Sequence, residues 1–118
     1  MSMLPVYLSL IVNVAVLVPV CLVILADGKR AEFAWGAKTD GRSILLAIYA
    51  TILIVSGLLL FVGPRNVLPI VHTVLAMQVI YKATTVLTVG LRSPVVISNV
   101  IIAALHSYTI YATLEGGP

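Results

Sequence analysis

Four long apolar runs take up most of this chain, and they limit its fold more than any other feature. The runs cover residues 4–26, 43–62, 67–90 and 95–114, and each contains at least 20 residues. About 20 helical residues are enough to cross a hydrocarbon core of ~30 Å. We therefore predict an all-α integral membrane protein, a single domain of four transmembrane helices in an antiparallel bundle with short loops.

The composition supports a lipid environment. Of the 118 residues, 61% are hydrophobic and 9% are charged, whereas about 25% of a soluble domain is charged. A soluble globule of this size would leave apolar patches against water and aggregate. The net charge is +3, but the basic residues form no stripe with interleaved aromatic side chains, so we expect lipid and not nucleic acid as the partner.

Short polar segments mark where the helices begin and end. Ser43 is expected to cap the second helix, and Asn66, at the end of the turn Gly63-Pro64-Arg65-Asn66, is expected to cap the third. Ser93 as the cap and Pro94 as the first helical residue open the fourth helix. The second and third helices should therefore form an antiparallel hairpin.

The basic residues predict the orientation of the chain in the membrane. With four spans, residues 27–42 and the turn near residue 92 lie on one side, and the turn at Arg65 lies on the other side with both termini. The first side holds the larger number of cations, namely Lys29, Arg30, Lys38, Arg42 and Arg92. Short loops rich in Lys and Arg stay in the cytoplasm. We therefore expect the inner membrane, a cytoplasmic loop 27–42 and both termini outside. The aromatic residues Phe33 and Trp35 within this loop suit the headgroup region, either as a loop alone or with a short interfacial helix.

Polar side chains inside the spans are the candidate functional residues, because they are costly in hydrocarbon. Pairing of the last two helices places Gln78 opposite His106 and Asn99 opposite Thr85, and Asn13 falls at a comparable depth in the first helix. Hydrogen bonds between such groups contribute about 0.6–2 kcal/mol each to helix association. The predicted intramembrane polar cluster consists of Asn13, Gln78, Lys82, Asn99 and His106.

Lys82 has two interpretations, because no Asp or Glu lies within the apolar runs. A buried ammonium without a carboxylate can bind an acidic headgroup, a quinone oxygen or an anion in transit. Alternatively, its stem extends toward the cytoplasmic interface, which is the interpretation that we favour.

His72 and His106 allow a cofactor hypothesis, the axial ligation of haem. Their expected depths differ, so two neutral histidines bonded to nearby oxygens are favoured over haem. We expect no metal site and most simply no cofactor, with a lipid or a quinone as the alternatives. The acidic residues lie in the loop and the tail, away from both histidines, so no catalytic residue is assigned and no enzymatic activity is expected.

The length and the number of spans are similar to those of small multidrug resistance transporters. Proton-coupled exchange in that family depends on a carboxylate in the first span, and the first span here has Asn13 and no acid. The resemblance is therefore one of architecture.

Three functions remain open. The first is an accessory or scaffold subunit of a larger energy-converting or transport complex of the inner membrane, bound to other membrane subunits. The second is a homo-oligomeric transporter or channel for an anionic or polar solute, lined by Gln78, Lys82, Thr85 and Asn99. The third is a quinone- or haem-binding membrane subunit. The absence of any sizeable soluble segment favours the first.

Overall fold

The four apolar runs form four long helices in the computed structural model, which describes residues 2–91 and 93–114. The described residues contain no strand, which confirms the all-α prediction, and four of the helices are long and apolar enough to span a membrane. A short helix and one 3-10 turn complete the fold. In chain order the elements are α1 (Leu4–Ala26), α2 (Lys29–Trp35), α3 (Asp40–Val62), η1 (Pro64–Val67), α4 (Leu68–Thr88) and α5 (Pro94–Leu114).

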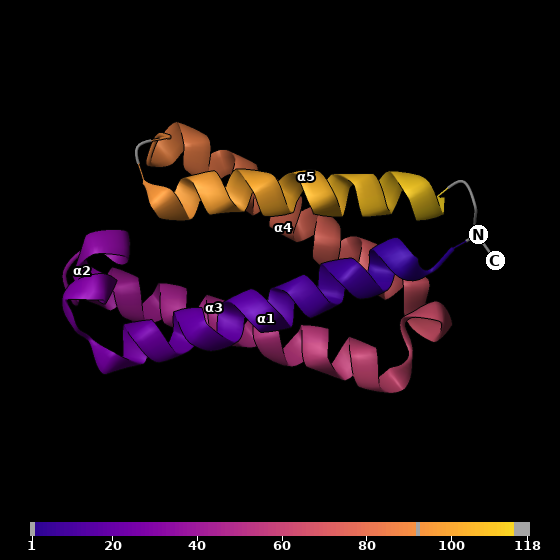
Figure 1. The fold of residues 1–118 in the computed structure, drawn as a ribbon, viewed down its shortest axis with the longest axis horizontal. Helices are drawn as coiled ribbons and strands as arrows, with labels where there is room; N and C mark the ends of the chain where they lie inside the picture. Colours follow the sequence, from indigo (N-terminus) through magenta and orange to yellow (C-terminus); the bar gives the residue numbers. More distant parts are fainter. Residues whose placement is uncertain (1, 92, 115–118) are drawn as a thin grey trace.

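The helices pack as two antiparallel pairs, α1 with α3 and α4 with α5, and α1 joins the pairs by contacting α5. By contrast, α3 and α4 diverge from the η1 turn that joins them, so they do not pack along their length as the predicted hairpin (Figure 1). The helix α2 lies at the end of the bundle opposite η1, where it contacts α1 and α5. This end, which also holds the turn between α4 and α5, is called the loop end below.

The long helices have the length and composition of membrane spans. Between 17% and 33% of the residues in their most apolar stretches are buried inside the bundle. Many large apolar side chains of these helices are exposed, which is the arrangement that a hydrocarbon solvent favours.

Two of the three predicted helix caps differ in the structure. Thr39 caps α3, because its Oγ1 accepts a hydrogen bond from the backbone N–H of Arg42 at 3.2 Å, so the helix begins three residues before Ser43. Asn66 does not cap the next helix; its Nδ2 donates to the carbonyl of Val62 at 3.1 Å and satisfies the end of α3. Asn66 takes this position because Gly63, at φ 98°, turns the chain back there. A Cβ on Gly63 would lie 3.0 Å from Asn66 Nδ2, so the turn requires glycine.

The start of the last helix is as predicted. Pro94 is the first residue of α5, and the hydroxyl of Ser93 accepts a hydrogen bond from the backbone N–H of Val95 at 3.2 Å. Proline suits this position because its missing N–H is one that an α-helix leaves unbonded.

The buried residues form two apolar clusters. One cluster lies toward η1 and includes Leu10, Leu59 and Leu75, and the other lies toward the loop end and includes Leu17 and Tyr49. Since Leu10 and Leu17 belong to different clusters, the part of α1 between them holds the boundary. Asn13 lies at that boundary and is itself buried.

Candidate functional site

Buried hydrogen bonds join α1 to α3 and α5. The Oδ1 of Asn13 accepts from Nε2 of His106 at 3.0 Å, and its Nδ2 donates to the hydroxyl of Ser56 at 3.1 Å. One helical turn away, the hydroxyls of Ser9 and Thr109 are 2.7 Å apart. All five side chains are buried. We call this set, Ser9, Asn13, Ser56, His106 and Thr109, the polar seam.

His72 lies in a different place from His106. Its Nε2 is 2.6 Å from the hydroxyl of Thr113, so this contact joins α4 to the end of α5. Thr113 lies seven residues beyond His106 on α5, which is about 10 Å along the helix axis. The two Nε2 atoms are therefore held about two turns apart by different partners, and this geometry does not fit the ligation of one haem iron by both histidines.

Lys82 points into the bundle, and not to the interface as we expected. The residue is 5% exposed, and its Nζ donates to Oδ1 of Asn99 at 3.2 Å. Asn99 in turn lies beside Thr85, with 3.5 Å between Nδ2 and Oγ1, so the predicted opposition of these two residues is present. The Lys82 ammonium is thus held between α4 and α5 by an amide oxygen.

Gln78 stands apart from the other polar residues. The residue is 3% exposed, yet neither its Nε2 nor its Oε1 has a hydrogen-bond partner among the described residues. The predicted cluster is therefore divided into an Asn13–His106 pair, a Lys82–Asn99 pair and an isolated Gln78. An unpaired buried amide costs about 1–3 kcal/mol, so its surroundings are informative.

Gln78 lines a groove between the diverging helices α3 and α4. The groove has a volume of about 530 Å³, and most of its wall is apolar. Ala47 and Thr51 form its small-residue side, and the hydroxyl of Thr51 is bonded to the carbonyl of Ala47 at 2.8 Å. We call it the α3–α4 groove. Its full lining is Ile44, Ala47, Ile48, Thr51, Ile52, Val55, Val74, Met77, Gln78 and Tyr81.

Lys82 lines a second hollow, at the loop end of the bundle. This Lys82 cavity has a volume of about 270 Å³ and is walled by α1, α2, α3 and α5, with Trp35, Tyr49 and Asn99 among its lining residues. A wider hollow of about 600 Å³ shares Trp35, Tyr49 and Asn99 with it and extends past Phe33. Phe33 is 81% exposed, so the two hollows together lead from the interior to the surface beside α2.

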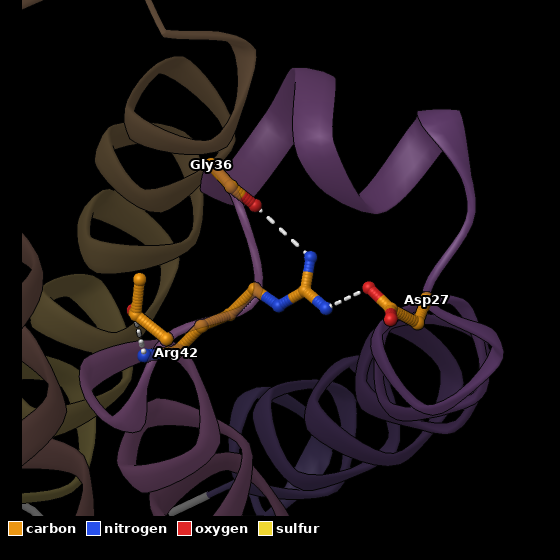
Figure 2. Close-up of polar contacts among 4 residues, drawn as sticks. Asp27, Gly36 and Arg42 are labelled. Carbon is orange, nitrogen blue, oxygen red and sulfur yellow. Dashed lines mark hydrogen bonds and ion pairs between the residues drawn. The ribbon is translucent and has the colours of Figure 1, made fainter.

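Arg42 holds α2 over this end of the bundle. Figure 2 shows its guanidinium between the carboxylate of Asp27, with which it forms an ion pair, and the carbonyl of Gly36, which accepts a hydrogen bond at 3.0 Å. Asp27 directly follows α1 and Gly36 directly follows α2, so one side chain fixes both ends of the short helix. The hydrogen bond from Arg42 lowers the pKa of the Asp27 carboxyl below its usual value.

The Arg42 contact also sets the position of Trp35 at the mouth of the Lys82 cavity. Trp35 is the last residue of α2, and its Nε1 donates to the hydroxyl of Tyr49 at 3.3 Å. The sequence pattern indicates Arg42 only as one of several cations in a loop. The signal for its role is the placement of opposite charges, with Asp27 directly after one span and Arg42 directly before the next.

No protein-family model matches the chain, and comparisons with curated proteins and with solved structures found no match either. The functional argument therefore depends on the geometry of the α3–α4 groove, the Lys82 cavity and the polar seam.

Proposed function

We propose that this protein is an accessory or scaffold subunit of a larger assembly in the inner membrane, and that the α3–α4 groove receives a transmembrane helix of a partner subunit. The observation that carries the proposal is the Gln78 amide, which is buried in the groove with both polar atoms unpaired. Both amide atoms are buried, so the Gln78 side chain must turn toward the groove to meet a partner side chain. The bond then removes the desolvation penalty and adds about 0.6–2 kcal/mol to association.

The wall of the groove supports a helix as the occupant. Small residues at interhelical contacts let two backbones approach closely in a bilayer. Ala47 and Thr51, four residues apart, lie on one face of α3. Because the Thr51 hydroxyl is already bonded to the Ala47 carbonyl, it needs no partner when another helix covers it.

The charge distribution supports the inner membrane with both termini outside. The loop end carries Lys29, Arg30 and Lys38 on its exposed surface, whereas Arg65 is the cation of the η1 turn. Cytoplasmic loops carry the excess of Lys and Arg, so α2 belongs on the cytoplasmic side. In this orientation the α3–α4 groove opens sideways into the lipid, where a partner helix arrives.

The test is gentle extraction from native membranes in a non-ionic detergent, followed by measurement of particle mass and identification of the copurifying proteins. We expect a particle heavier than a monomer of 12.5 kDa, containing a second membrane protein. Ala47→Leu should obstruct the groove and weaken the complex about five- to a hundredfold, because overpacking a close contact typically costs about 1–3 kcal/mol.

Ala104→Leu is the matched control, since Ala104 is an exposed alanine on α5 outside the groove lining. It should leave the complex intact. A stable monomer in the mildest detergents, or a particle made of copies of this chain alone, would overturn the proposal. Equal yields from the two alanine variants would locate the contact elsewhere than the groove.

A further inference from the structure

The Lys82 cavity holds a positive charge that no anionic side chain balances. Within residues 2–91 and 93–114, no carboxylate lies within 4 Å of the Lys82 ammonium. Its one hydrogen-bond partner there is the neutral amide of Asn99. An ammonium can donate three hydrogen bonds, so two remain for a group that enters the cavity. A buried cation of this kind is costly unless an anion accompanies it.

The other walls of the cavity indicate the body of such an anion. Apolar side chains from α1 and α5, including Leu17, Val20 and Ile102, make up most of the lining, and the aromatic rings of Trp35 and Tyr49 complete it. Because the described residues that line this wall carry one ammonium and no second cation, a single negative charge on an apolar body is the best match. A multiply charged phosphate would leave charge unbalanced in a low-dielectric site.

The position of the charge favours a carboxylate as the anionic group. Lys82 and Asn99 come from neighbouring helices and both line the cavity. Carboxylates accept several hydrogen bonds through two oxygens, and their bonds to ammonium groups are among the stronger ones in proteins. The adjoining wider hollow, which extends beside α2 to the exposed Phe33, gives an apolar chain a route into the cavity.

We propose that the Lys82 cavity is a binding site for an amphiphilic monocarboxylate, with the carboxylate on the Lys82 ammonium and the acyl chain against α1, α5 and Trp35. The cavity shares no lining residue with the α3–α4 groove. The site therefore does not depend on the proposed partner helix, and either proposal can fail without the other.

The experiment is a titration of the purified protein with decanoate in a non-ionic detergent at pH 7. Binding is measured through the fluorescence of Trp35, the only tryptophan of the chain. We expect a saturable change. Lys82→Met should weaken binding about ten- to a hundredfold, the range for loss of a hydrogen bond to a charged group. Lys38→Met, which removes a lysine from the exposed loop, is the matched control and should bind like the wild type.

Three further probes define the ligand class on the unaltered protein. Decanol, which has the chain without the charge, and formate, which has the charge without the chain, should each bind at least about tenfold more weakly than decanoate, since each lacks one of the two contacts. Dihexanoyl phosphatidylglycerol tests a lipid headgroup as the source of the anion and should compete poorly.

The proposal is overturned if decanoate causes no saturable change, if decanol binds as tightly as decanoate, or if Lys82→Met and Lys38→Met behave alike. Tight binding of formate or of the phosphatidylglycerol overturns the amphiphilic monocarboxylate as the ligand. If Lys82→Met does not fold, as judged by circular dichroism and gel filtration, the decanoate and decanol titrations of the wild type decide the question.

Discussion

The interfaces α1–α5 and α3–α4 differ in how their polar groups are used. Between α1 and α5, Asn13 bonds to His106 and Ser9 contacts Thr109. Among the described residues, the buried polar atom of this seam without a partner is His106 Nδ1. Between α3 and α4, Gln78 is equally buried but unpaired, and the helices diverge. Yet α3 and α4 are joined by a turn of a few residues, whereas α1 and α5 lie at opposite ends of the chain. Hydrogen bonding, and not closeness in sequence, distinguishes the closed interface from the open one.

The polar groups of α4 explain why the α3–α4 interface is open, because they bond to α5 and not to α3. His72 and Lys82 both bond to α5, through Thr113 and Asn99, so these contacts attach α4 to α5 at two levels. The polar contacts of α3 with the rest of the bundle also point away from α4: Ser56 bonds to α1, and Tyr49 and Arg42 contact α2 and its flanking residues. With both helices held by other partners, the short turn at η1 connects α3 and α4 without closing the space between them.

The largest expected effect of a substitution is at the centre of the polar seam. Asn13→Leu removes two hydrogen bonds and leaves buried polar atoms of His106 and Ser56 without a partner. We expect the free energy of unfolding in detergent to fall by about 1–3 kcal/mol. Ala15→Leu, at an exposed position of α1, should change it little. A variant Asn13→Leu as stable as the wild type would mean that the seam does not hold the bundle together.

Gln78→Leu should have the opposite sign in the isolated protein. The amide has no partner to lose, and its replacement by an apolar side chain of similar size removes a desolvation penalty. We expect unchanged stability or a gain of up to about 1 kcal/mol, in the same unfolding assay. A loss similar to that of Asn13→Leu would show that the amide is bonded in the isolated chain, and the distinction between the two interfaces would disappear.

The sequence is enough to predict the spans and the polar residues within them, because apolar run length and the cost of buried polar groups are properties of each segment alone. The opposition of Asn99 and Thr85 follows in the same way, from counting residues across a short turn. The unpaired state of Gln78 does not follow, since it depends on how far α3 lies from α4. The interior position of Lys82 and the Arg42 contact likewise depend on where helices lie in space.

The smallest effect on stability is expected at the loop end. The contact there is an ion pair with a partly exposed carboxylate, whereas the contacts of the polar seam are buried hydrogen bonds. Arg42 lowers the pKa of Asp27, so the stabilisation of α2 is present above the ordinary carboxyl pKa of about 3.9 and is lost as the pH falls through the lower folded value. Acidification below about pH 4 should therefore release α2 and change the fluorescence of Trp35. Asp27→Asn should show the released signal already at pH 7, without that transition, whereas Asp40→Asn, at another exposed aspartate, should titrate like the wild type. A transition that persists unchanged in Asp27→Asn would assign the acid response to another group, and the Arg42 contact would then not be what positions Trp35 over the Lys82 cavity.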